Sequence, residues 1–253
     1  MYKRFFPTLI LLLPAGIAAA QSPNASMQST QVSAASGQSG NAGLMKINDF
    51  TSNTAMINRS STILRGSPYA DRRWLPAHLV MTSNVQLPRV PLKYDVLNQR
   101  LLMRSLERAS DSLQLDDRLL ASFELEEPAT NSTPAHRRTF RRFLEAPLPT
   151  QRPEFVEVLH EGKYKLLKRY VKTLRKAAPQ NGFDSGSATD EVMDKTVYYL
   201  SLPDASVVQV KLTLKSLQSA APALGTALLL VPGAALAKTD AEWATVFDQA
   251  DRK

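Results

Sequence analysis

Two basic segments of the chain carry the side chains best suited to chemistry, and that chemistry is the binding of anions. Guanidinium and ammonium groups hold phosphate, sulfate and carboxylate through charge-assisted hydrogen bonds. The candidate residues, interleaved with phenylalanine and tyrosine, are Arg137, Arg138, Arg141, Arg142, Lys165, Lys168, Arg169 and Lys172. On one face of a sheet they would form a cationic strip with aromatic platforms; the alternative is a solvated face whose aliphatic stems cover the layer beneath.

The other ionisable residues do not form a metal or acid-base motif. His78, His136 and His160 stand far apart, whereas zinc ligands are usually a few residues from one another. The acidic pairs at 116–117 and 126–127 are neighbours in sequence, so a strand would point their side chains to opposite faces. We therefore expect no metal and no cofactor.

Nucleophile signatures are missing as well. The sequence has no cysteine and no G-x-S-x-G segment. No catalytic residue can be named from the sequence. The remaining enzymatic alternative is a hydrolase whose site is assembled from residues that are distant in sequence.

The first twenty residues have the layout of a cleavable secretory signal. Lys3 and Arg4 precede an apolar run at 5–17, and Ala18 and Ala20 match the preference of signal peptidase. This predicts a signal peptide at 1–20, a mature chain from Gln21, and a periplasmic or secreted protein. Because a lipobox requires a cysteine, no lipid anchor is expected there.

Composition limits the class of partner without naming one. The formal charge is +8, and removal of the leader lowers it to +6. This excess suits anionic glycans, lipopolysaccharide or an envelope protein, whereas nucleic acid is not expected because no recognition motif is present. The apolar stretch at 220–237 is broken by Pro222 and Pro232, so no transmembrane span is expected after signal cleavage.

The chain divides into a tether and one domain. Residues 21–43 consist largely of small and polar residues and cannot bury enough apolar surface to order themselves. We expect a disordered tether there and a single α+β domain at 44–253. With no cysteine, that domain must be stabilised by packing alone.

Alternating apolar residues predict most of the domain to be strands. Such patterns cover 79–87, 90–96, 102–104, 111–116, 120–126 and the segment that begins at Phe155. They suggest an antiparallel, partly curled β-meander of seven to nine strands. A hairpin turned at Pro203 and Asp204 should follow a loop near 179–186.

The arm at 164–175 fits both a helical stripe and a strand. We favour the strand, because the arm follows a strand-like segment directly after Gly162, where a hairpin turn is expected. The remainder is predicted to be helical, at 216–221, at 223–231 and in a last helix. Thr239 and Glu242 should form its capping box, and its apolar face carries Trp243, Val246, Phe247 and Ala250.

Taken in order, several segments resemble a family of uncharacterised exported bacterial proteins. They are GSPY, Trp74, VPLKYDVLNQRLLM, FVEVLHEGKYKLLKRYVKTLRKA and DKTVYYLSLPDASVVQVKLTLKSL, and they span 66–217. GKYKLLKRY and KTVYYL are the most specific. The resemblance implies a secreted or periplasmic protein with a strand-rich body and a helical tail, and it carries no catalytic residues. Related sequences have Asp-Gly where this chain has Asp204 and Ala205.

These observations together favour a non-catalytic binding or scaffolding protein of the bacterial envelope that contacts anionic surfaces.

Overall fold

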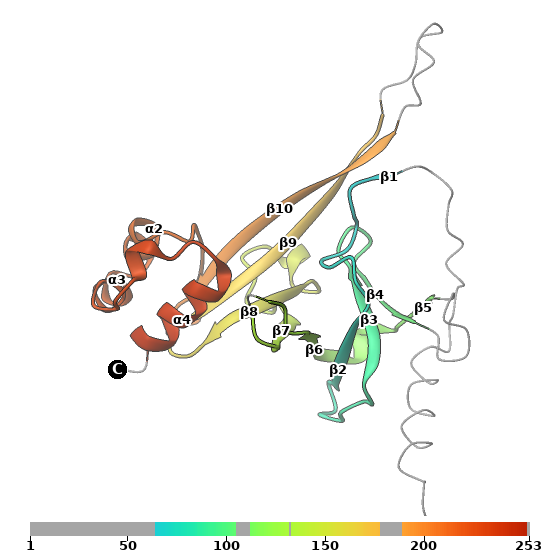
Figure 1. Cartoon of the computed structure of the whole chain (residues 1–253), viewed down its shortest axis with the longest axis horizontal. Coiled ribbons are helices and arrows are strands. Elements are labelled where there is room, and N and C mark those ends of the chain that lie inside the picture. The colour runs from blue at the N-terminus through green and yellow to red at the C-terminus, as the bar shows by residue number, and fades with distance from the viewer. Residues whose placement is uncertain (1–63, 105–111, 132, 178–188, 252–253) are drawn as a thin grey trace, which may run out of the picture. The chain divides into compact units, whose positions relative to one another are not determined.

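The computed structural model of the chain describes residues 64–104, 112–131, 133–177 and 189–251. Figure 1 shows a twisted sheet followed by a group of helices. The predicted signal at 1–20, the predicted tether at 21–43 and the first part of the predicted domain at 44–63 lie outside the described residues. They therefore stay predictions.

Strands are the most abundant elements of the described chain and belong to one eleven-stranded sheet. They are β1 Leu64–Arg65, β2 Leu75–Met81, β3 Val90–Asp95, β4 Arg100–Arg104, β5 Ser112–Gln114, β6 Leu120–Glu127, β7 His136–Arg142, β8 Phe155–Glu161, β9 Lys165–Arg175, β10 Asp190–Ser201 and β11 Val207–Val210. Three α-helices, α2 Leu214–Ala220, α3 Pro222–Leu229 and α4 Asp240–Ala250, come after the last strand. Strands followed by helices confirm the α+β class.

Burial follows the alternation that predicted the strands. In β3, Val90, Leu92 and Tyr94 are buried, while Pro91 and Lys93 between them are partly exposed. The ambiguous arm is a strand, as favoured: β9 pairs antiparallel with β8 on one side and with β10 along its whole length on the other.

A single antiparallel meander is too simple a description of the sheet. The strand order is β1-β10-β9-β8-β7-β6-β2-β3-β4-β5, with β11 also on β10. Two meanders, β2 to β5 and β6 to β11, are therefore joined side by side through β2 and β6. The sheet is mixed, because β1 pairs in parallel with β10. It has more strands than predicted, since sequence patterns indicated neither the two-residue β1 nor the strand in the basic segment, β7.

The sheet bends strongly between the two meanders. β3 and β8 are separated by β2, β6 and β7, so a flat sheet would hold them about 19 Å apart at about 4.8 Å per strand. The ring of Tyr94 on β3 instead lies 5.9 Å from the ring of Phe155 on β8. The Tyr94 hydroxyl also accepts a hydrogen bond of 3.3 Å from the Phe155 amide. Strands that are distant in the sheet thus face one another.

The bend encloses the first of three apolar clusters. Its aromatic centre is Tyr94, Phe123, Phe140 and Phe155, with Phe123 stacked on Phe140 at 4.7 Å. The second cluster is Phe143, Ala146, Val156, Leu167, Val197 and Tyr199. Because side chains alternate along a strand, the members of this cluster on β8, β9 and β10 lie on one face of the sheet, and Phe155 lies on the other.

The helical tail covers the third cluster. Leu217, Leu224, Leu228 and Trp243 pack there with Leu166 and Leu200 of the sheet. All three helices were predicted, although α2 begins two residues earlier than expected, with Thr213 as its N-cap. The predicted capping box of α4 is present, and Trp243, Val246, Phe247 and Ala250 are its buried face, as expected.

The hairpin between β10 and β11 is confirmed at the predicted turn. Ala205 has a positive φ of 64° there, a conformation that glycine adopts without cost and alanine does not. Asp204 stabilises the turn by accepting hydrogen bonds from the amide and the hydroxyl of Ser206. The tight turn therefore forms with alanine at this position.

Candidate functional site

The eight predicted anion-binding residues do not share one face of the sheet. They come from β7 and β9, which both flank β8. Alternation along these strands places Arg138, Arg142, Lys168 and Lys172 on one face and Arg137, Arg141, Lys165 and Arg169 on the other. A continuous cationic strip does not result.

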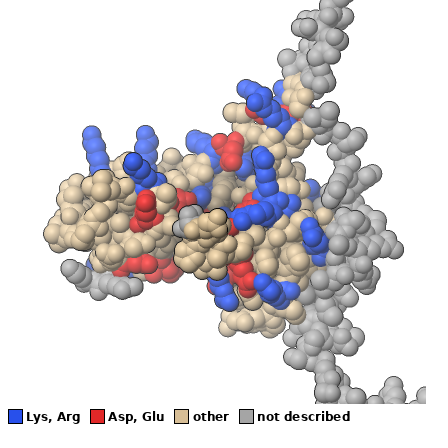
Figure 2. Space-filling model, viewed as in Figure 1, with Lys and Arg blue, Asp and Glu red and all other residues tan. Residues whose placement is uncertain are grey.

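Each of these eight cations has a carboxylate within 4 Å. The partners are Glu124 for Arg137, Glu157 for Arg138, Glu145 for Arg141, Asp117 for Arg142, Glu161 for Lys165, Asp240 for Lys168, Glu154 for Arg169 and Asp194 for Lys172. Most of the predicted positive charge is thus compensated within the protein, as the mixed colours in Figure 2 also indicate.

Arg138 is the centre of a partly buried ionic network. Its guanidinium donates to both carboxylate oxygens of Glu157, at 2.8 and 3.1 Å, and to the hydroxyl of Tyr170 at 2.7 Å. Asp71 and Glu127 lie at 3.4 and 3.5 Å on its other side. Burial, followed by the charge of Glu157, raises the pKa of Tyr170, so the hydroxyl keeps its proton. These contacts connect β6, β7, β8 and β9 and are structural.

His160 forms a second internal link. Its Nδ1 and Nε2 atoms lie 2.6 Å from Asp248 and 3.0 Å from Asp251, so that the ring ties β8 to the end of α4. Asp251 also accepts a hydrogen bond from the Tyr164 amide. His78 pairs with Glu126 at 2.6 Å. In the ranges that the structure describes, no group of histidine, aspartate and glutamate side chains is arranged to hold a metal ion.

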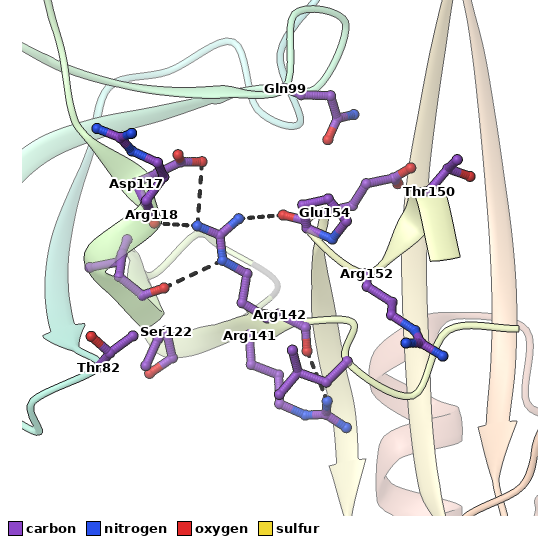
Figure 3. A pocket seen from close by; sticks show the side chains of 14 residues that line it. Thr82, Gln99, Asp117, Arg118, Ser122, Arg141, Arg142, Thr150, Arg152 and Glu154 are labelled. Carbon is purple, nitrogen blue, oxygen red and sulfur yellow. Dashed lines mark hydrogen bonds and ion pairs between the residues drawn. The ribbon is translucent and has the colours of Figure 1, made fainter. Parts of the chain in front are cut away.

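The best candidate for a ligand site is a pocket of about 890 Å³ where β6 begins, β7 ends and β8 begins (Figure 3). We call it the arginine pocket, because four arginines line it. Its lining residues are Thr82, Gln99, Asp117, Arg118, Leu120, Ala121, Ser122, Arg141, Arg142, Leu144, Thr150, Arg152, Pro153 and Glu154.

Arg142 occupies the middle of this pocket. Its guanidinium donates to the backbone carbonyls of Asp117, Leu120 and Pro153, and Figure 3 shows these bonds on three sides of the group. It also lies 4.0 Å from the ring centre of Phe155. Carbonyl oxygens carry no net charge, so only the Asp117 carboxylate, at 3.6 Å, balances this cation. Arg142 is therefore fixed in position.

The two carboxylates of the pocket both face arginines. Burial raises the pKa of Asp117, and the charge of Arg142 opposes that rise without cancelling it. Glu154 accepts hydrogen bonds of 2.6 and 2.7 Å from Arg169. Both carboxylates of the pocket are thus engaged with arginines.

The other three arginines differ in how strongly they are held. Arg118 is bound by Asp116 and Arg141 by Glu145. Arg141 also keeps a buried Nε that has no hydrogen-bond partner. Arg152 is exposed, and within the described part of the chain its guanidinium forms no hydrogen bond or ion pair. Arg152 is thus the cation of this pocket most accessible to an anion.

Leucines are exposed beside these cations. Leu144 lines the pocket with 70% of its surface exposed, and Leu119 and Leu148 in adjoining segments are 51% and 55% exposed. Leu144 therefore adds exposed apolar surface to the wall of the pocket, and a contiguous apolar surface suits an apolar group. The arginine pocket therefore offers cationic and apolar surface together.

The sequence identified only part of this site. Arg141 and Arg142 were among the predicted residues, but Arg118 and Arg152 were not. The pocket combines residues from several separate segments, and no local pattern connects them. The one available signal was the proline-rich break at 147–153, which carries Thr150, Arg152 and Pro153.

Comparison of the chain with protein-family models, with curated proteins and with solved structures finds no match. None of the described helices is long and apolar enough to cross a membrane.

Proposed function

We propose that this protein is an exported, non-catalytic binding protein of the bacterial envelope that holds an anionic amphiphile in the arginine pocket. The observation that carries the proposal is the pairing of the accessible Arg152 guanidinium with the exposed Leu144 in one cavity. An anionic headgroup would bind the cation, and an attached apolar chain would cover the leucines.

The charge of the pocket supports an anionic headgroup. Three of the four arginines have a carboxylate within 4 Å, whereas Arg152 has none in the described ranges and remains uncompensated. Guanidinium groups bind phosphate and carboxylate through two parallel hydrogen bonds. Because Arg142 is already held by backbone carbonyls, it supplies a fixed positive potential without any cost of ordering a flexible side chain.

The apolar part of the pocket favours an amphiphile over an anionic glycan. Leu120, Ala121, Leu144 and Pro153 line it, and such side chains gain little from contact with a sugar. Covering exposed leucines with hydrocarbon is favourable by about 25 cal/mol per Å². Among the expected partners, lipopolysaccharide combines phosphate groups with acyl chains and fits this description.

Binding is a better reading of the site than hydrolysis. A hydrolase needs a base or nucleophile that can reach the substrate. The carboxylates of this pocket face Arg142 and Arg169 instead. Export to the periplasm or beyond, which the leader predicts, would bring the pocket to envelope amphiphiles.

Isothermal titration with n-dodecyl phosphate below its micelle concentration tests the proposal. Two comparison ligands separate the parts of this molecule: inorganic phosphate has the anionic group without the chain, and dodecyl maltoside has the chain without the charge. We expect dodecyl phosphate to bind at least tenfold more tightly than either. Arg152→Glu and Leu144→Ser should each weaken it several-fold.

Matched controls are Lys195→Glu, which makes the same charge change on β10, and Leu174→Ser, which removes an exposed leucine of β9. These should leave the affinity unchanged. Equal affinity in all five proteins, or no heat with dodecyl phosphate, would exclude the arginine pocket as the site.

A further inference from the structure

The helical tail contains a long segment without charge. From Ser216 to Ala237 the sequence has no acidic or basic residue, although it runs through α2, α3 and the single-turn helix Ala234–Leu236. The inner side of this segment packs on the sheet through Leu217, Leu224 and Leu228. Its other side is largely exposed.

Three leucines on that other side point into solvent. Leu229, Leu230 and Leu236 are 57%, 72% and 76% exposed, and the last two are the most exposed large apolar residues described. Backbone hydrogen bonds keep the turn between them compact, from the Leu230 amide to Ala227 and from the Leu236 amide to Gly233. We call residues 229–236 the leucine tip.

Lysines flank the uncharged segment. Lys211 and Lys215 precede it and Lys238 follows it. Unlike the lysines of β9, none of these three has a carboxylate within ion-pair distance in the described ranges. The carboxylate next to Lys238, that of Glu242, is held by the amides of Lys238 and Thr239 at the start of α4.

Lys211 and Lys215 also line a groove of about 480 Å³ that contains the hydroxyls of Thr213, Ser216 and Ser219. A groove of this size and chemistry can take a phosphate-bearing headgroup. Figure 2 shows the outer part of the helical tail largely tan, with basic side chains standing along its border. Cations thus lie in the sequence on both sides of the uncharged segment and, in this view, along one edge of the tail.

We propose that the leucine tip, together with Lys211, Lys215 and Lys238, docks the protein on the surface of an anionic lipid bilayer. Exposed leucines enter the boundary between headgroups and acyl chains, and lysines bind the anionic headgroups. The eight-residue helix α3 is far too short to span the membrane, so docking is peripheral. None of these residues lines the arginine pocket, so the inference goes beyond the proposed function and is independent of it.

Vesicle flotation tests the inference. Full-length protein would be mixed with vesicles of phosphatidylcholine alone, or with about one third phosphatidylglycerol. We expect binding to the anionic vesicles that weakens with added salt. The triple variant L229S/L230S/L236S should lower the partition coefficient at least tenfold. The variant K211Q/K215Q/K238Q should lower it on anionic vesicles by a comparable factor, since each lysine near a charged surface contributes about fivefold.

Two triple variants serve as matched controls. L64S/L174S/M193S removes three exposed apolar residues of β1, β9 and β10, and R72Q/K176Q/K195Q removes three cations that have no carboxylate partner in the described ranges. Both should partition like the wild type. Because every variant has the same residues 1–63, any membrane binding by the leader is common to all of them.

A second readout does not depend on removing apolar surface. In the variant Leu230→Trp, indole fluorescence should shift to shorter wavelength with anionic vesicles and be quenched by brominated acyl chains. The parent protein, with Trp74 and the buried Trp243, provides the background. Docking at this surface is excluded if the leucine and lysine variants float as the controls do, or if the emission that Leu230→Trp adds does not change with vesicles.

Discussion

His160 on β8 lies 2.6 Å from Asp248 on α4, a residue 88 positions later in the chain. Its second ring nitrogen faces Asp251 at 3.0 Å. Both ring nitrogens of His160 are thus within hydrogen-bond distance of a carboxylate. The last helix is therefore attached to the sheet by polar side-chain contacts in addition to its apolar face.

Removing this histidine should weaken the attachment. We expect His160→Ala to lower the free energy of unfolding by about 3 kcal/mol, because two carboxylates lose their histidine partner and one of them, Asp251, is nearly buried. Urea denaturation measures the change. The exposed His136 on β7 is the control, and His136→Ala should change stability by less than about 0.5 kcal/mol. Equal effects of the two substitutions would contradict the assigned role.

Gly162 tests the same attachment from the other side. A Cβ at this position would collide with the carboxylate of Asp251 and come within 2.7 Å of the His160 ring. Gly162→Ala should therefore destabilise the protein, and the loss should be smaller when His160→Ala is already present. Strictly additive losses in the double variant would show that Gly162 and His160 are not coupled.

The network around Arg138 should respond asymmetrically to substitution. Glu157→Gln leaves the Arg138 cation without its main partner, and we expect a loss of about 3 to 5 kcal/mol. Replacing both partners, in R138M/E157L, should cost less than the single change, since no unpaired charge remains. The exposed pair of Arg137 and Glu124 is the control: Arg137→Met should cost less than about 1 kcal/mol.

Asp71 should contribute to stability in a pH-dependent way. Burial by itself raises its pKa, but hydrogen bonds from Arg73 and the charges of Arg73 and Arg138 bring the pKa below its ordinary value of 3.8. A carboxyl whose pKa is depressed by folding stabilises the folded state above its unfolded pKa, and loses that effect as the pH falls through the folded pKa. The stability difference between wild type and Asp71→Asn should therefore shrink below pH 3.8.

Asp117 should show the opposite trend. Its pKa is raised by burial, so ionisation at neutral pH opposes folding, and that penalty disappears as the pH falls below the unfolded pKa. Relative to wild type, Asp117→Asn should gain stability at neutral pH and lose this advantage in acid. Unfolding curves at a series of pH values give the stability of Asp71→Asn and of Asp117→Asn relative to wild type. If the two differences change with pH in the same way, the assigned electrostatics are wrong.

The turn at Ala205 offers a stabilising substitution. At the Ala205 φ of 64°, glycine avoids the steric cost of a Cβ, although it also makes the unfolded chain more flexible. We expect the first effect to be larger, so that Ala205→Gly stabilises the protein by about 0.5 to 1 kcal/mol. Ala223→Gly in α3 should instead destabilise by about 1 kcal/mol. If the melting temperature falls in both variants, the turn does not require a positive φ at position 205.

Elements with a local signal could be predicted from the sequence. The capping box of α4 and the hairpin at Pro203 and Asp204 depend on residues within a few positions of each other, and both are present. The β9 arm was ambiguous because its apolar residues fit two periods. Its pairing with β8 and β10, which no local pattern encodes, decides in favour of a strand.

Features that depend on distant residues could not be predicted. Nothing near Leu120 indicates that β6 returns to β2, so one continuous meander was the natural expectation. The partners of Lys168 and His160 lie 72 and 88 positions away. The arginine pocket, and most of the carboxylates that pair with the basic residues of β7 and β9, likewise depend on segments that are distant in sequence.

The neighbours of the early strands are made late. β2 must wait for β6, and Leu64 of β1 pairs with Asp190, in the second half of the chain. Until those segments have been synthesised, β2 and β1 lack these partners, so folding of the sheet depends on contacts between residues distant in sequence, which slow it. The bend that brings Tyr94 against Phe155 thus makes the first apolar cluster depend on segments 61 positions apart in the chain.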